Sequence, residues 1–191
     1  MIALAAALLA PPLPLKVHTR ADWGAKPPVL ELPRHKIDRI TLHHTGVRQA
    51  PGRPFFDKLR GLQAWSQRAD ELAGGRAKPQ WADIPYHYYI DVNGEAAECR
   101  PVELPGDTNT SYDVRGHLLI VVEGSFPTDY FNIRQKRTLI RLTAMLAERH
   151  SVSADRIAGH MDFAPGETDC PGESIMQVIP EIKSAIQKRT P

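Results

Sequence analysis

The sequence has no long hydrophobic run, almost no net charge and no repeated unit. No segment approaches the roughly 20 consecutive apolar residues that a membrane-spanning helix needs, so we expect no stable membrane insertion. The formal net charge is only +2, which is too small to indicate a nucleic-acid partner. What remains is an average composition, with 42% hydrophobic and 24% charged residues, which is typical of a globular protein.

Cysteine is scarce as well, with two residues in a chain of 191. So small a number says little about the redox compartment of the protein. In an exported protein Cys99 and Cys170 can pair as a disulfide. In the other interpretation Cys170 binds a metal ion and Cys99 is a small buried apolar residue.

The N-terminus carries a short apolar stretch, MIALAAALLAPPLP, about as long as the core of a secretory signal. It lacks the usual basic residues, since the first one is Lys16. We therefore expect residues 1–15 to be an export-signal-like or disordered segment outside the fold. An export signal indicates a periplasmic or extracellular protein, and a disordered tail leaves a cytoplasmic one open. The remaining residues, 16–191, are enough for one well-buried domain and few for two.

Three stretches are typical of β-strands. Residues 34–44 alternate apolar and polar side chains, which predicts a strand that ends at a pair of histidines. Residues 84–99 predict a β-hairpin around a two-residue turn at Asn93 and Gly94. The continuous apolar run 116–125 predicts a central strand that is buried on both faces.

Helical periodicity predicts two long helices, over 55–72 and 132–150, the second capped by Asn132. A last helical segment follows residue 175, with Pro180 in its first turn. Strands and helices interleave, and the hairpin makes the sheet mixed. We therefore expect an α/β fold, a single three-layer domain with a mixed central β-sheet covered by helices.

Residues 100–116, between the hairpin and the central strand, show no clear periodicity. A loop of this length in a compact domain is either functional or disordered. Its asparagine, threonine and tyrosine content suits contact with a sugar or a peptide.

The most informative stretch is IAGHMDFAPGETDCPGE, residues 157–173. His160 and Cys170 are ten residues apart and can reach one metal ion from a short loop. The histidine pair at the end of the predicted strand can supply a third ligand. Zinc accepts imidazole nitrogen and thiolate sulfur, and three protein ligands leave a fourth position open for water. The plainer interpretation is a set of ordinary histidines and a buried thiol.

Four motifs occur in order along the chain: TRADWGAKPP, ITLHHTG, WADIPYHYYIDVNGE and IAGHMDFAPGETDCPG. Together they resemble the zinc amidase domain shared by bacterial N-acetylmuramoyl-L-alanine amidases, phage lysozyme-type amidases and peptidoglycan recognition proteins. The resemblance runs from about Arg20 to the end of the chain. It implies the same three-layer α/β fold.

The resemblance also implies a site that binds Zn2+. The three metal ligands of the family fall on His43, His160 and Cys170. Its catalytic tyrosine, which stands just before a histidine in a YH motif, falls on Tyr86, whose neutral phenol can donate a hydrogen bond to a developing oxyanion. Phage-type members carry a lysine two residues before the third ligand. This chain has Thr168 there, which can donate a hydrogen bond but carries no charge.

The neighbours of these residues are expected to be structural. Adjacent strand residues face opposite sides, so His44 should pack beside His43 and not bind the same metal. His87 and His117 are expected to be hydrogen-bonded structural histidines. Asp162 either supports a ligating histidine or caps its own loop.

The function that the resemblance implies is zinc-dependent hydrolysis of the amide bond between N-acetylmuramic acid and L-alanine, in peptidoglycan or its fragments. A non-catalytic peptidoglycan-binding module and a zinc peptidase acting on the stem peptide are the alternatives. Loss of the cysteine ligand or of the tyrosine would favour the binding module, and both residues are present. We expect a monomer whose partner is the peptidoglycan or muropeptide substrate.

Deleting the N-terminal run through about Pro14 is expected to leave the thermal unfolding midpoint of the domain unchanged, because the family-like sequence begins only at about Arg20. Differential scanning calorimetry of the full-length and shortened proteins measures this midpoint. A large drop after the deletion would show that the segment packs against the domain.

Overall fold

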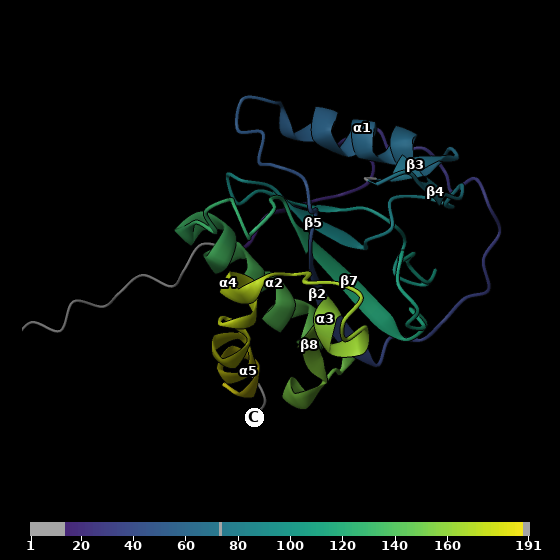
Figure 1. Ribbon diagram of the computed structural model, residues 1–191. Coiled ribbons are helices and arrows are strands. Elements are labelled where there is room, and N and C mark those ends of the chain that lie inside the picture. The colour runs from purple at the N-terminus through teal and green to yellow at the C-terminus, as the bar shows by residue number, and fades with distance from the viewer. Residues whose placement is uncertain (1–13, 73, 189–191) are drawn as a thin grey trace, which may run out of the picture.

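The computed structural model of the chain describes residues 14–72 and 74–188, so most of the expected N-terminal segment, 1–13, lies outside the described residues. The centre is a six-stranded sheet with the order β1-β6-β5-β7-β2-β8 (Figure 1). The strands are β1 (Val17–His18), β2 (Arg39–His44), β5 (Tyr88–Ile90), β6 (Ala96–Glu98), β7 (His117–Val122) and β8 (Ile157–Gly159). Every neighbouring pair is parallel except β5 and β6, so the sheet is mixed, as predicted.

Helices cover both faces of this sheet and complete three layers (Figure 1). One face carries α1 (Phe55–Ser66), and the other carries α2 (Ile133–His150) and α5 (Ile179–Gln187), which pack against each other. The shorter helices are η1 (Ala154–Arg156), α3 (His160–Phe163) and α4 (Glu173–Met176). The predicted three-layer α/β domain is confirmed.

Strand β7 lies at the centre of the core, and all six of its residues are buried. Leu118, Ile120 and Val122 face the large apolar cluster under α2 and α5. Val121 faces the smaller cluster under α1. The continuous apolar run in the sequence follows from this position, because a central parallel strand covered by helices has no solvent-facing side.

The first long helix is shorter than the sequence predicts. The periodicity indicated a helix over 55–72, but α1 ends at Ser66, and β3 (Asp70–Leu72) pairs antiparallel with β4 (Arg76–Lys78). The buried ammonium of Lys78 donates a hydrogen bond of 3.0 Å to the Ser66 carbonyl, which satisfies a free group at the helix end. The prediction was wrong because tertiary hydrogen bonds override local periodicity here.

The predicted hairpin forms, with one more loop residue than expected. The Asp91 N–H donates to the Glu95 carbonyl at 2.9 Å, which leaves three residues in the loop and not two. Gly94 adopts a φ of 81°, as the last residue of a three-residue hairpin loop requires. The Asp91 carboxylate accepts hydrogen bonds from the backbone of Asn93 (2.8 Å) and Glu95 (2.9 Å), and these bonds favour the wider loop.

Helices α2 and α5 begin as predicted. The Asn132 side chain accepts hydrogen bonds from the backbone of Arg134 (2.9 Å) and Gln135 (3.1 Å), and so caps α2. Pro180 stands in the first turn of α5, where its missing N–H costs nothing. None of the described helices is long and apolar enough to cross a membrane.

A buried cluster of charges joins α1 to the sheet. Lys58 of α1 is 5% exposed, and its Nζ lies 2.8 Å from a Glu123 carboxylate oxygen and 3.4 Å from one of Asp91. Glu123 also accepts hydrogen bonds of 2.9 Å from the backbone of Ala50 and Val92. Two carboxylates therefore share one ammonium in a region from which water is largely excluded.

Replacing this ammonium, in Lys58→Met, is expected to lower the free energy of unfolding by about 3–5 kcal/mol, because two buried carboxylates lose their counter-charge. The matched control is Lys136→Met, since Lys136 pairs with Glu181 at the surface and removing that pair should cost about 0–1 kcal/mol. Urea unfolding of both variants measures the difference. Equal losses would contradict the importance of the buried cluster.

Candidate metal centre

The two expected histidine ligands come together at one edge of the sheet. Strands β2 and β8 are parallel neighbours, and their register pairs Leu42 with Gly159. His43 and His160 are the next residues after this pair, and their ring centroids lie 4.7 Å apart. The strand register therefore sets the distance between two residues that are 117 positions apart in the sequence.

Cys170 reaches the same point from the loop that follows α3. The Met161 N–H donates a hydrogen bond of 2.7 Å to the Cys170 carbonyl, which holds the loop against the start of α3. Gly159 permits this approach, because a Cβ there would lie 2.3 Å from Met176 Sδ and 2.8 Å from Pro171 Cδ. A glycine at this position is therefore required by packing.

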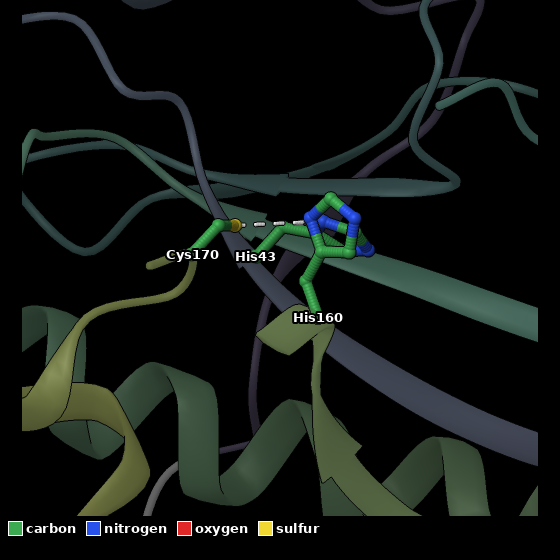
Figure 2. A group of neighbouring side chains, drawn as sticks. All are labelled: His43, His160 and Cys170. Atoms are coloured by element: carbon green, nitrogen blue, oxygen red, sulfur yellow. Dashed lines mark hydrogen bonds between the residues drawn. The ribbon is translucent and has the colours of Figure 1, made fainter. Parts of the chain in front are cut away.

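The three side chains point toward one another (Figure 2). The Cys170 Sγ lies 3.7 Å from the His43 Nδ1, and one ligand atom from each of His43, His160 and Cys170 lies within 4.8 Å of the others. Zinc bonds of about 2.0 Å to nitrogen and 2.3 Å to sulfur place two tetrahedral ligands roughly 3.5 Å apart. The spacing therefore fits one zinc ion with a fourth position left for another ligand.

Burial sets the protonation states of these groups. It lowers the pKa of His43 well below its ordinary value and that of His160 to about 4, so both rings are neutral near pH 7 and keep a lone pair. Burial also raises the pKa of the Cys170 thiol to about 12, although the backbone N–H of His44, 3.3 Å from Sγ, favours the thiolate. A divalent cation among the three groups stabilises the thiolate, so the trio suits a metal ion better than a free nucleophilic thiol.

Tyr86 stands beside the trio, with its ring centroid 5.2 Å from that of His43. It lies two residues before β5, within the stretch predicted as a hairpin but outside the strand itself. Burial raises the pKa of its phenol, which therefore stays protonated and can act as a hydrogen-bond donor.

A hollow of about 200 Å³ opens beside these residues, and Tyr86, Thr168, His43, His160 and Cys170 all line it. The Thr168 hydroxyl oxygen accepts a hydrogen bond of 3.1 Å from the Cys170 N–H. Its own proton is left to donate toward the hollow. All five residues that the sequence singled out for the site thus border one space.

The remaining histidines of this region lie outside the trio, as predicted. His44 packs against Phe126, with ring centroids 6.2 Å apart. His87 is fully buried, and its two ring nitrogens lie 2.9 Å from the Leu104 carbonyl and 2.8 Å from a backbone N–H of β7. The Nδ1 of His117 lies 2.7 Å from a threonine hydroxyl of β2.

Two open alternatives are decided by the geometry. The Asp162 carboxylate accepts a hydrogen bond of 2.8 Å from the Gly159 N–H, so it caps its own loop. Cys99 and Cys170 are both free, and Cys99 belongs to the cluster under α1, so the two do not form a disulfide.

Sequence analysis assigned no residue of the loop 100–116 to the site, yet two of them contact the ligands. The Thr110 Oγ1 lies 2.7 Å from the His160 Nε2, and the Tyr112 hydroxyl lies 3.5 Å from the His43 Nε2. The missing periodicity indicated that the loop is either functional or disordered, and its composition suited contact with a sugar or a peptide. Which hydroxyl of the loop contacts which histidine ring depends on the backbone path of the loop. The sequence contains no signal that predicts this path.

Residues 33–173 match the family model for N-acetylmuramoyl-L-alanine amidase of type 2. The chain belongs to this amidase family. The match includes the strand end with His43 and the loop with Cys170, and it confirms the resemblance on which the expected fold and site were based.

Solved structures of the amidase fold agree with this assignment. The chain is similar to Drosophila peptidoglycan recognition protein SD, with 23% identity, a TM-score of 0.70, and coverage of 88% of this chain and 95% of the other. It is similar to the amidase LysC of Clostridium intestinale, with 22% identity, a TM-score of 0.62, and coverage of 90% and 97%. Drosophila PGRP-LB gives 22% identity, a TM-score of 0.67, and coverage of 90% and 94%. A search of curated protein sequences gave no match.

Amidases and peptidoglycan recognition proteins thus share the fold of this chain. Membership in the amidase family supports cleavage or binding of peptidoglycan as the class of function.

We expect one zinc ion per chain in protein purified without added metal, and its loss in Cys170→Ala, because two imidazoles alone hold zinc weakly in a site built for three ligands. Elemental analysis measures the zinc content. Cys99→Ala is the matched control, since Cys99 is equally buried but lies outside the trio. Full zinc content in Cys170→Ala would remove the thiol from the site.

Proposed function

We propose that the protein is a zinc-dependent amidase that hydrolyses the bond between N-acetylmuramic acid and L-alanine in peptidoglycan or its fragments. The observation that carries the proposal is the spacing of His43, His160 and Cys170, with 3.7 Å between sulfur and nitrogen, beside an open hollow that Tyr86 lines. Family membership supports the amide bond as the target.

The side chains of the trio fit a zinc ion. The two imidazoles are neutral, and the Cys170 thiol also lies near a backbone N–H donor, that of His44. His43, His160 and Cys170 would hold it. When bound, zinc acidifies water and polarises a carbonyl group, which are the two requirements for cleaving a stable amide. The reaction breaks the carbon–nitrogen bond, adds hydroxyl to the lactyl carbonyl carbon and leaves a proton on the alanine nitrogen.

Tyr86 is the proposed oxyanion donor. Its phenol remains protonated and lines the hollow next to His43, so it can donate a hydrogen bond to the carbonyl oxygen as negative charge develops there. Thr168 offers a second, neutral donor from the opposite loop. Position 168 itself carries no lysine and so no positive charge, although Arg76 also lines the hollow.

A second hollow, of about 560 Å³, continues from the first and suits the peptide part of the substrate. Six residues line both hollows: Thr45, Gly46, Trp81, Pro85, Tyr86 and Asn109. Apolar side chains of α1 and the β3–β4 hairpin line the far end, together with Arg53. A stem peptide has alanine methyl groups and carboxylates that match such a lining.

The same fold and hollow also suit a protein that binds peptidoglycan without cutting it, or a zinc peptidase that cuts within the stem peptide. The retained cysteine and tyrosine favour an enzyme over a binding module. We further propose that the protein acts as a monomer outside the cytoplasm, where intact peptidoglycan is found.

The deciding experiment is incubation of the purified zinc protein with muropeptides, followed by mass spectrometry. An amidase releases the sugar with a free lactyl carboxylate and a peptide that begins with alanine. A binding module leaves the muropeptide intact while retaining it in equilibrium dialysis. A peptidase releases shorter peptides and leaves the sugar attached to alanine.

Tyr86→Phe is expected to lower the turnover number by roughly 10²–10³, the usual effect of removing one oxyanion donor. The change removes one hydroxyl and almost no volume, so zinc content and thermal stability should stay at the wild-type values. Tyr88→Phe is the matched control, because Tyr88 belongs to the cluster under α2 and does not line the hollow. Wild-type turnover in Tyr86→Phe would exclude the phenol from catalysis, and loss of muropeptide binding would make it a substrate contact.

A further inference from the structure

The loop 108–112 covers the outer side of both imidazole ligands. Its Thr110 Oγ1 lies 2.7 Å from the His160 Nε2, and its Tyr112 hydroxyl lies 3.5 Å from the His43 Nε2. The Tyr112 ring packs against His160, with centroids 5.1 Å apart. The His43 Nδ1 faces the thiol at 3.7 Å, and the Nε2 atoms of both rings face the same loop.

This arrangement decides which ring nitrogen of His160 carries a proton. An imidazole that gives its Nδ1 lone pair to a cation must keep its proton on Nε2. His160 is only 8% exposed, so that N–H needs an acceptor within the protein. The Thr110 hydroxyl oxygen is at hydrogen-bond distance, and a second hydroxyl, that of Thr108, is farther away at 3.4 Å.

Thr110 has a neighbour that allows it to act as an acceptor. Its hydroxyl lies 2.8 Å from the Thr108 Oγ1, and its backbone N–H donates to the same oxygen at 3.2 Å. When the Thr110 proton points to Thr108, the oxygen lone pairs of Thr110 face the His160 ring. The two threonines thus form a short chain that ends on the metal-binding histidine.

A latch fixes this loop to the loop that carries the cysteine. Glu167, three residues before Cys170, accepts a hydrogen bond of 2.9 Å from the Ser111 N–H and a second one from the Ser111 hydroxyl. Ser111 and Glu167 are both exposed, but the two hydrogen bonds from Ser111 end on the same carboxylate. The latch joins the segment with Thr110 to the segment between His160 and Cys170, so the acceptor and the ligands are held as one unit.

We infer that Thr110 is a positioning residue for the metal centre, which fixes the tautomer and the ring orientation of His160, and that Glu167 supports it by latching the loop through Ser111. The inference rests on the proposed function, since it assumes a metal ion on the trio. Outer partners of this kind typically change metal affinity by about 10–100-fold.

The test is the zinc Kd of the purified protein, measured without substrate by competition with a chelator of known affinity. Thr110→Val keeps the shape of the side chain and removes the acceptor, so zinc should bind about 10–100-fold more weakly. Thr110→Ser restores the hydroxyl and should return the Kd to near the wild-type value. Glu167→Ala should weaken binding in the same direction, which provides a second variant at a residue that does not itself contact His160 through a hydrogen bond.

Thr128→Val is the matched control, because Thr128 is exposed in a loop after β7 and bonds only to the backbone of Ser125. Circular dichroism of the zinc-free variants checks that they fold. A zinc Kd in both Thr110→Val and Glu167→Ala that equals the wild-type Kd would overturn the inference and leave the proposed amidase intact. A wild-type protein that binds no zinc would overturn both.

Discussion

The parallel pairing of β2 with β8 is the constraint on which the site depends. Its register brings His43 and His160 side by side at the end of two neighbouring strands, and Gly159, the residue before His160, leaves room for the loop with Cys170. A shift of one residue would turn one of the histidines to the other face of the sheet. The burial of Ile40 and Leu42 in the core under α2 and α5 opposes that shift, so the apolar core fixes the relative positions of His43 and His160.

The sequence predicted most of the fold because its signals are local. Alternation predicted the strand that ends at His44, the apolar run predicted β7, and Asn132 predicted the start of α2. Two predictions from the sequence were wrong for the same reason. The end of α1 at Ser66 depends on a hydrogen bond that the Lys78 ammonium donates, and the three-residue hairpin loop depends on bonds that the Asp91 carboxylate accepts. Hydrophobic periodicity carries no information about these bonds. The site was predicted through a resemblance of motifs, and the structure brings those residues together around one hollow.

The two faces of the sheet differ in the side chains that pack against them. The face under α2 and α5 is filled by aliphatic side chains and provides most of the hydrophobic stabilisation. The face under α1 is smaller and contains the charge cluster of Lys58, and the larger hollow opens beside it. A hollow removes apolar contacts from a core, and beside this one buried ionic and hydrogen-bonded contacts join α1 to the sheet.

The histidines show how ligand positions differ physically from structural ones. In His35 and His87 both ring nitrogens have backbone partners, at distances between 2.8 and 3.0 Å, so neither ring has a lone pair to give. In His43 and His160 the Nε2 faces a hydroxyl of one loop, and the Nδ1 of His43 faces the thiol. All four rings have a pKa lowered by burial, so charge alone does not separate them. What separates the two pairs is whether the ring nitrogens bond to backbone groups, as in His35 and His87, or face side-chain hydroxyl and thiol groups, as in His43 and His160.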